Sequence, residues 1–206
     1  YIYIMAQKHK KTPNELFTEY LDIYLDAGFS GRSTDEFEIR FGTKFWNPIT
    51  QLDFNQVMAK LKSDGFICEN PTGEYHLNIT NQYIHPRTGM VKLSNIRTEV
   101  AGIFGIQEYC KKNTFDRENK PKYITFTQKI PKMYNDSYGE AEKKLFPIDY
   151  NDFQFRVNYK DEREPNYKAL GNILSHWEDS KKIFRFIKRF TFRHENYPLK
   201  IDCSIV

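Results

Sequence analysis

The sequence predicts an α+β protein built mainly from an antiparallel β-barrel, with a few helices at its flanks. Phe and Tyr are frequent, and aromatic residues make up 16% of the 206 residues. Such a composition favours strands and packed sheets over a helical bundle. Several segments also alternate apolar and polar residues with the period of two that is typical of strands with one buried face. Their polar positions are mostly cationic, which indicates that one polar face recurs from strand to strand.

Start, stop and periodicity signals place the helices and strands along the chain. A Thr-Pro-Asn-Glu start predicts a helix from residue 12. Apolar stripes and a basic C-terminal turn are among the signals that predict further helices over residues 49–64, 100–112, 140–144 and 170–181. In the helix over residues 49–64 we expect Asp53 and Gln56 to form the capping box and Gly65 to end the helix. Period-two alternation predicts strands over residues 35–41, 74–84, 90–98, 123–129, 155–160, 184–193 and 200–204.

Several function classes are excluded by what the sequence lacks. It contains neither GxxxxGK[ST] nor GxGxxG, which excludes P-loop and Rossmann chemistry. Cys68, Cys110 and Cys203 are far apart and form no zinc-binding pattern, so we expect free thiols in a reducing compartment. No apolar run has the length of a membrane span, and a soluble, intracellular protein is expected. The net charge of +4 is compatible with an anionic ligand.

The segment 35–41 is the most informative strand. On an extended chain Glu36, Glu38 and Arg40 lie on one face, and Phe37, Ile39 and Phe41 lie on the other. Two carboxylates this close repel one another unless solvent or a divalent cation neutralises them, and Mg²⁺ and Mn²⁺ prefer such oxygen ligands. Taken alone, the strand also fits the solvated face of an ordinary antiparallel sheet.

A pair of strands near the C-terminus carries basic residues, whose charge is opposite to that of the carboxylates in segment 35–41. In segment 184–193 the alternation places Phe184, Phe186, Lys188, Phe190 and Phe192 on one face and Arg185, Ile187, Arg189, Thr191 and Arg193 on the other. After a turn, Lys200, Asp202 and Ser204 share a face of the returning strand. Other strands contribute further cations to the recurring polar face, namely Arg97, Lys129, Arg156 and Lys160. A closed barrel gathers such positions in its lumen, where a triphosphate and a metal ion would balance both sets of charges.

Three segments resemble the triphosphate tunnel metalloenzymes, and among them the RNA 5′-triphosphatase domains of mRNA-capping enzymes from large DNA viruses and fungi. Residues 36–40 resemble the family's Glu-x-Glu metal strand. Residues 184–192 resemble its basic strand with alternating aromatic residues, and residues 200–204 resemble the basic-x-Asp-x-Ser/Thr strand that follows. The match spans most of the chain from residue 36 onward.

The resemblance implies an eight-stranded antiparallel tunnel that removes the γ-phosphate of nascent mRNA as the first step of cap formation. It implies that Glu36 and Glu38 bind Mg²⁺ or Mn²⁺. The catalytic residues by this analogy are Glu36, Glu38, Arg185, Arg189, Lys200 and Asp202. The substrate-binding residues are Arg40, Arg97, Lys129, Arg156, Lys160 and Ser204. Such chemistry depends on positioning and charge neutralisation more than on a covalent nucleophile.

We further expect one triphosphate-tunnel domain over residues 1–206, with residues 1–34 as an N-terminal helical extension, within a longer polypeptide. The partners that the resemblance implies are 5′-triphosphate RNA and a fused or associated guanylyltransferase or methyltransferase. The implied location is cytoplasmic, in the host cytoplasm, a viral factory or the virion if the protein is viral.

One departure from the family keeps a second function open. The family has a second Glu-x-Glu strand near the end of the domain, and none follows Asp202 in this sequence. Either it lies beyond Val206, or this member lacks it and is a non-catalytic module that binds triphosphate or RNA in a capping or transcription complex. Hydrolysis of short triphosphates on the same barrel is a related enzyme function. Glu69, Glu74, Glu162 and Glu164 are further acids, which we expect on the solvated surface, and no histidine has ligand spacing.

Overall fold

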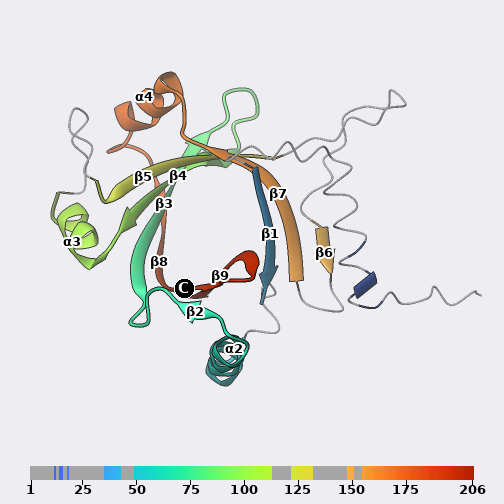
Figure 1. The fold of residues 1–206 in the computed structure, drawn as a ribbon. Helices are drawn as coiled ribbons and strands as arrows, with labels where there is room; N and C mark the ends of the chain where they lie inside the picture. The colour runs from blue at the N-terminus through green and yellow to red at the C-terminus, as the bar shows by residue number, and fades with distance from the viewer. Residues whose placement is uncertain are drawn as a thin grey trace, which may run out of the picture. The chain divides into compact units, whose positions relative to one another are not determined.

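The structure is a computed structural model, and it describes residues 12, 14, 15, 18, 35–42, 49–112, 122–131, 148–150 and 155–206. The chain forms two compact units, one of Tyr1–Lys44 with Pro131–Lys160 and one of Phe45–Ile130 with Asp161–Val206. The helices are α2 (Gln51–Ser63), α3 (Ile103–Lys112) and α4 (Tyr167–Ser175). The strands are β1 (Asp35–Phe41), β2 (Ile67–Cys68), β3 (Glu74–Ile84), β4 (Val91–Ala101), β5 (Ile124–Pro131), β6 (Ile148–Tyr150), β7 (Phe155–Arg163), β8 (Lys182–His194) and β9 (Tyr197–Ile205) (Figure 1).

The first unit contributes β1, β6 and most of β7. Strand β7 is the neighbour of β1 and pairs antiparallel with β6, with Val157 opposite Ile148. Phe155, Val157 and Tyr159 of β7 are buried, with at most 2% of each residue exposed. The alternation along β7 therefore separates an apolar face from a polar one, as the sequence predicts.

The second unit contains a curved antiparallel sheet in which β5, β4, β3 and β8 are consecutive neighbours. Strand β8 is paired along both edges. One edge pairs with β3 and, further along, with the two-residue strand β2, while the other edge pairs with β9. The predicted return of the chain after residues 184–193 as an antiparallel partner is therefore confirmed.

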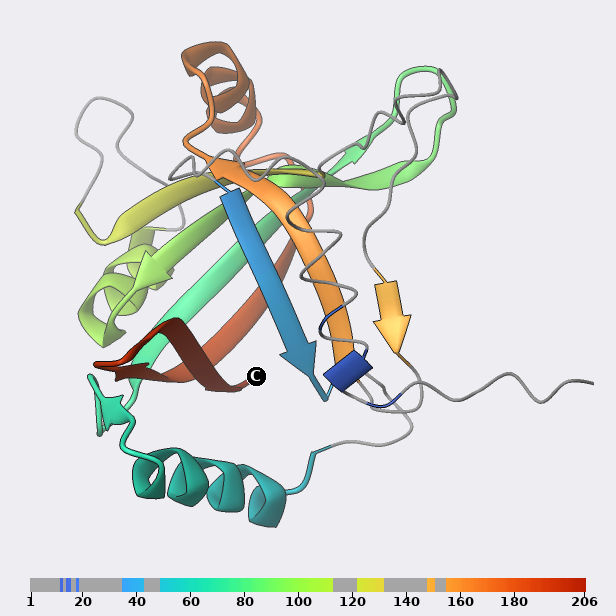
Figure 2. The same cartoon turned by 45° about the vertical axis from the view of Figure 1, so that its right-hand side comes forward.

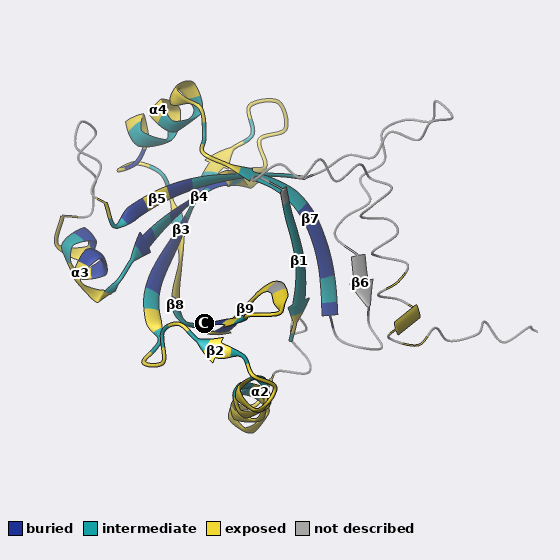
Figure 3. Cartoon of the chain, viewed as in Figure 1, coloured by how far each residue is buried: buried dark blue, intermediate teal, exposed yellow. Residues whose placement is uncertain are grey.

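The core of the second unit lies on one face of this sheet, beneath two helices. Its buried members are Leu77, Ile79, Ile96, Val100, Ile106, Tyr109, Ile124, Phe126 and Trp177. Helix α3 contributes Ile106 and Tyr109, and α4 packs against the same cluster through Leu170 and Ile173. Both helices lie on the outer side of the curved sheet (Figure 2), and the buried positions follow the strands (Figure 3). The opposite face of the sheet is left for polar side chains.

Several helix boundaries differ from the sequence prediction. Strand β4 continues to Ala101, so helix α3 starts at Ile103 and not at residue 100. Helix α4 is Tyr167–Ser175, displaced toward the N-terminus from the predicted 170–181, because Asn166 caps it by accepting a hydrogen bond from the backbone N–H of Ala169. In α2 the capping box is Thr50 with Asp53, in place of Asp53 with Gln56.

Some sequence predictions fall on residues outside the described ranges. They include the helix at 140–144 and the apolar face of the first helix, whose positions are Leu16, Tyr20, Ile23 and Tyr24. The start of that first helix is described. The backbone N–H of Thr12 donates to Glu15 and the N–H of Glu15 donates to Thr12 Oγ1, which is the reciprocal capping pattern. No helix within the described ranges is long and apolar enough to cross a membrane.

At two helical glycines, substitution by alanine is expected to change the stability of the fold in opposite directions. A Cβ on Gly105 of α3 would lie 2.8 Å from the ring of Tyr123, whereas a Cβ on Gly171 of α4 would meet no atom within 4 Å. Gly171→Ala should therefore stabilise the fold by roughly 0.5–1 kcal/mol through helix propensity. Gly105→Ala should destabilise it by roughly 1–3 kcal/mol through overpacking. Thermal unfolding of both variants checks this, and a higher Tm for Gly105→Ala would contradict it.

Candidate functional site

In the first unit, β1 and β7 present their polar side chains on one face. The ring centroid of Phe37 lies 6.3 Å from that of Tyr159. The ring centroid of Phe41 lies 5.7 Å from that of Phe155. Since the apolar side chains of the two strands meet, the alternating polar positions share the opposite face. This acidic-strand face holds the predicted residues Glu36, Glu38, Arg40, Arg156 and Lys160.

Glu38 provides the test of whether this face suits a metal ion. Its Oε1 forms an ion pair with Arg40 Nε at 2.8 Å. Its Oε2 is buried and has no hydrogen-bond partner among the described residues. A buried carboxylate oxygen of this kind costs free energy unless a cation or donor meets it. The carboxylates of Glu36 and Glu38 therefore fit a hard cation such as Mg²⁺ or Mn²⁺. Within the described ranges no group of three or more Asp, Glu, His or Cys side chains is placed to hold a metal, so a metal ion at these two carboxylates would need further ligands.

In the second unit, the strand registers gather the predicted basic residues on the face opposite the core. Arg189 lies opposite Glu74 on one side and Ser204 on the other. Arg97 lies opposite Thr80 and Thr127, and Arg185 opposite Asn78. This basic face holds the predicted residues Arg97, Lys129, Arg185, Arg189, Lys200, Asp202 and Ser204. Lys188 lies on the other face with the aromatic residues, 5.4 Å from the ring centroids of Tyr75 and Phe190, as the alternation predicts.

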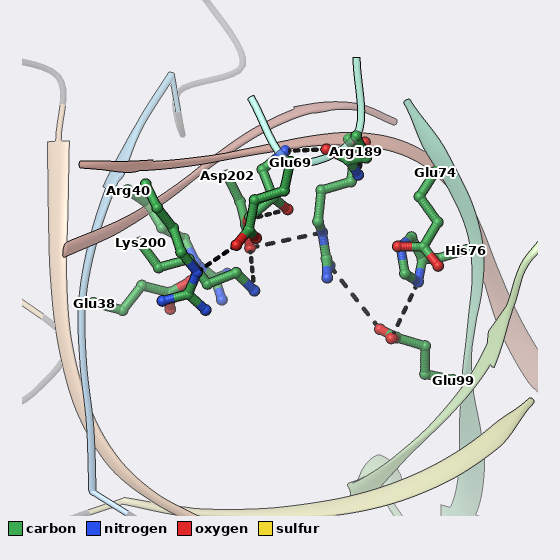
Figure 4. Close-up of polar contacts among 12 residues, drawn as sticks. Glu38, Arg40, Glu69, Glu74, His76, Glu99, Arg189, Lys200 and Asp202 are labelled. Carbon is green, nitrogen blue, oxygen red and sulfur yellow. Dashed lines mark hydrogen bonds and ion pairs between the residues drawn. The ribbon is translucent and has the colours of Figure 1, made fainter. Parts of the chain in front are cut away.

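Arg189 lies between two carboxylates without being hydrogen-bonded to either. Its Nη2 is 4.0 Å from Glu99 Oε2, and its Nε is 3.8 Å from Asp202 Oδ2 (Figure 4). The Nε is buried and donates no hydrogen bond within the described part of the chain. Both separations exceed hydrogen-bond length. The guanidinium thus lies between the two carboxylates without a hydrogen bond to either, on a side chain that is 22% exposed.

Asp202 is fixed from two further directions. Thr191, the residue directly opposite in β8, donates its hydroxyl to Asp202 Oδ1 at 2.8 Å. Lys200 Nζ lies 3.2 Å from Asp202 Oδ2. The carboxylate therefore lies beside two cations, Lys200 and Arg189, on the basic face.

Glu99 completes the charged contacts of this face. Its Oε1 lies 3.2 Å from His76 Nδ1, and His76 Nε2 lies 3.4 Å from Glu74 Oε2. The hydrogen bond with His76 holds the pKa of Glu99 below its ordinary value against the opposing effect of burial, and the nearby charges of Arg189 and Arg97 add to this. Glu99 is therefore a carboxylate held between the His76 ring and the guanidinium groups of Arg189 and Arg97.

The backbone that carries Arg189 is fixed by an asparagine between β2 and β3. Asn70 Nδ2 donates to the carbonyl of Arg189 at 3.1 Å, and Asn70 Oδ1 accepts from the N–H of Thr191 at 2.6 Å. Strand β8 loses a strand partner here, because β3 pairs with it only up to Arg189 and β2 pairs from Phe192. The side-chain amide replaces the missing ladder hydrogen bonds and fixes the strand at the two residues that face Glu99 and Asp202.

The remaining predicted residues differ in their surroundings. Arg185, Lys200 and Ser204 are exposed, whereas Arg97 and Lys129 are partly buried. Lys129 forms an ion pair with Glu162, and the side chain of Glu162 is only 25% exposed. The expectation that Glu162 lies on the solvated surface is therefore wrong, because its carboxylate is paired with Lys129 of a neighbouring strand. Glu164 is exposed, as expected.

Glu99 and His76 were not identified by the sequence. The predicted strand 90–98 ended one residue before Glu99, because a helix was predicted from residue 100 onward despite Gly102 and Gly105. The alternation itself held the signal, since Glu99 follows Arg97 by two residues and shares its face. His76 lacked any ligand spacing, and only the register between β3 and β4 brings it to Glu99.

Comparison with known proteins gives a structural likeness and no sequence likeness. Neither a protein-family model nor a curated protein matches the chain. The RNA triphosphatase domain of a trifunctional mimivirus mRNA capping enzyme is similar in structure, with a TM-score of 0.51 and 15% sequence identity over 93% of this chain and 77% of that one.

Two further structures, described as a triclinic and a monoclinic form of mimivirus capping enzyme triphosphatase, have TM-scores of 0.47 and 0.49. They are 14% and 13% identical and cover 88% and 94% of this chain and 73% and 78% of theirs. At 15% identity the first likeness shows the fold. The predicted fold class, α+β with an antiparallel sheet and a few flanking helices, is confirmed.

Proposed function

We propose that this chain is a metal-dependent RNA 5′-triphosphatase, a polynucleotide 5′-phosphatase that removes the γ-phosphate of nascent mRNA before cap formation. Its fold is that of a viral RNA triphosphatase domain. The observation that carries the proposal beyond the fold is Arg189, a partly buried guanidinium held by charge between Glu99 and Asp202 with its Nε free of hydrogen bonds within the described ranges. A phosphate oxygen is the acceptor that such a donor suits.

In the proposed reaction, water attacks the γ-phosphorus and the anhydride bond to the β-phosphate breaks, which yields inorganic phosphate and diphosphate-ended RNA. Charge develops on the oxygens of the transferred phosphoryl group, so fixed cations and donors stabilise the transition state. Arg189 donates N–H groups to these oxygens, and Arg97, Arg185 and Lys200 add positive charge. Asp202 orients Lys200 and Arg189.

Glu36 and Glu38 would hold Mg²⁺ or Mn²⁺, which polarises a phosphate oxygen when bound. Arg40, ion-paired with Glu38, positions that carboxylate. We propose that four further residues contact the substrate. Lys129, Arg156 and Lys160 contribute positive charge, and Ser204 donates its hydroxyl. The proposed partners are 5′-triphosphate RNA and a fused or associated guanylyltransferase or methyltransferase, and the proposed location is the cytoplasm of a host, a viral factory or a virion.

The test is phosphate release from RNA with a 5′-triphosphate end, in the presence of Mg²⁺ or Mn²⁺. The same RNA with a 5′-diphosphate end is the matched control, because it has the same bases but no γ-phosphate. ATP and inorganic tripolyphosphate, added as competitors, show whether the RNA is preferred. We expect release from triphosphate RNA, and loss of release when the metal is chelated.

The alternative of a non-catalytic binding module predicts a different outcome of the same experiment. A folded protein that binds triphosphate RNA but releases no phosphate with either metal would contradict the proposed enzyme and support the binding module. Release from ATP with no preference for RNA would point instead to hydrolysis of short triphosphates.

A further inference from the structure

Arg189 has a charge environment that is unusual for a guanidinium on a basic face. Carboxylates lie on two sides of it, Glu99 on β4 and Asp202 on β9, both outside hydrogen-bond distance. An arginine close to a single carboxylate normally forms a paired, bidentate contact that occupies its donors. Here the two attractions oppose one another, and Figure 4 shows the guanidinium between them.

Glu99 does not move freely between its neighbours, because His76 holds it. The ring of His76 is buried, with 5% of the residue exposed, and its Nδ1 lies 3.2 Å from Glu99 Oε1. A carboxylate only accepts hydrogen bonds, so this ring nitrogen carries the proton. His76 thereby directs one oxygen of Glu99 toward β3 and leaves the other, Oε2, toward Arg189.

We propose that Glu99, held by His76, is a positioning residue that keeps Arg189 away from Asp202 so that the guanidinium donors remain available to the triphosphate. The inference rests on the proposed function, because it takes the bound anion to be a triphosphate. It assigns a role to an acidic side chain on a face that binds an anion. If Glu99 is neutralised, Asp202 is the remaining carboxylate beside Arg189, and the guanidinium pairs with it.

Charge repulsion alone predicts the opposite effect of neutralising Glu99 on the binding of an anion, and this difference makes the positioning role testable. Glu99→Gln removes a negative charge from the basic face and, by long-range electrostatics alone, tightens the binding of a polyanion. Under the proposed role the same variant weakens binding, because Arg189 is drawn to Asp202. We expect the Kd for inorganic tripolyphosphate to rise about tenfold, as for the loss of one charge-assisted hydrogen bond.

The experiment is titration calorimetry of the protein with inorganic tripolyphosphate, which requires no turnover. Glu108→Gln is the matched control, since it makes the same chemical change on helix α3 at a residue that is paired with Lys111. A pair of His76 variants separates positioning from packing. The Nδ2 of asparagine can replace the Nδ1–H donor, so His76→Asn should keep tight binding, whereas His76→Leu should weaken it as Glu99→Gln does.

The outcomes distinguish this inference from the proposed function. Unchanged or tighter binding by Glu99→Gln, with its Tm as in the wild type, would overturn the positioning role even if the wild type hydrolyses RNA ends. Binding by the wild type without phosphate release would overturn the proposed enzyme and leave the positioning role to be decided by the same titration. If the wild type binds no tripolyphosphate, the positioning role is wrong, and phosphate release from triphosphate RNA decides the proposed enzyme separately. If a His76 variant fails to fold, the Glu99→Gln titration alone decides.

Discussion

Glu38→Gln is expected to lower the rate of phosphate release from 5′-triphosphate RNA by about 10²–10³-fold, the range seen when one electrostatic group of an active site is removed. The substitution keeps the shape of the side chain but removes the charge that attracts a divalent cation. It also leaves an uncharged amide where Glu38 Oε2 is buried and lacks a hydrogen-bond partner within the described ranges. Glu36→Gln should act in the same direction, because both carboxylates belong to the proposed ligand set. Steady-state kinetics over a range of Mn²⁺ concentrations measures the loss.

The metal dependence separates a ligand from a structural residue. For a ligand variant, part of the activity should return at high Mn²⁺, since mass action offsets the weaker site. Glu164→Gln is the control, because Glu164 is exposed and the change in charge is identical. Full activity of Glu38→Gln at low Mn²⁺ would refute the role of the acidic strand. An equal loss of activity in Glu164→Gln would also refute that role.

Arg189→Lys is expected to lower the same rate by roughly 10²-fold, although the positive charge is retained. Lysine lacks the planar fork of donors, and its compact ammonium pairs with one carboxylate at a time. Between Glu99 and Asp202 it should move to one of them, whereas the guanidinium remains between both. The loss should appear in kcat/KM with 5′-triphosphate RNA.

The control for this substitution is Arg87→Lys, the same change at an exposed residue of the β3–β4 turn. Circular dichroism and Tm establish that both variants are folded. If Arg189→Lys retains the wild-type kcat/KM, charge alone is sufficient at this position, and the guanidinium geometry has no role in the reaction.

Local alternation in the sequence was sufficient to decide which residues share a face. In β1, the contacts of Phe37 and Phe41 with β7 leave Glu36, Glu38 and Arg40 on the other side. Successive side chains of any strand point to opposite faces, so this result needs no knowledge of the strand's neighbours. Helix ends were less predictable, because caps such as Thr50 and Asn166 compete with other acceptors a few residues away.

Periodicity along the chain is enough to predict the antiparallel α+β class, the two polar faces and the residues on them. How those residues combine depends on the pairing of distant strands. Arg189 is placed between Glu99 and Asp202 by the pairing of β8 with β3 and β9, and of β3 with β4. Asn70 fixes that backbone from a segment more than a hundred residues away in the sequence. Register between distant strands arises from packing and hydrogen bonding of the whole sheet, which no local periodicity encodes.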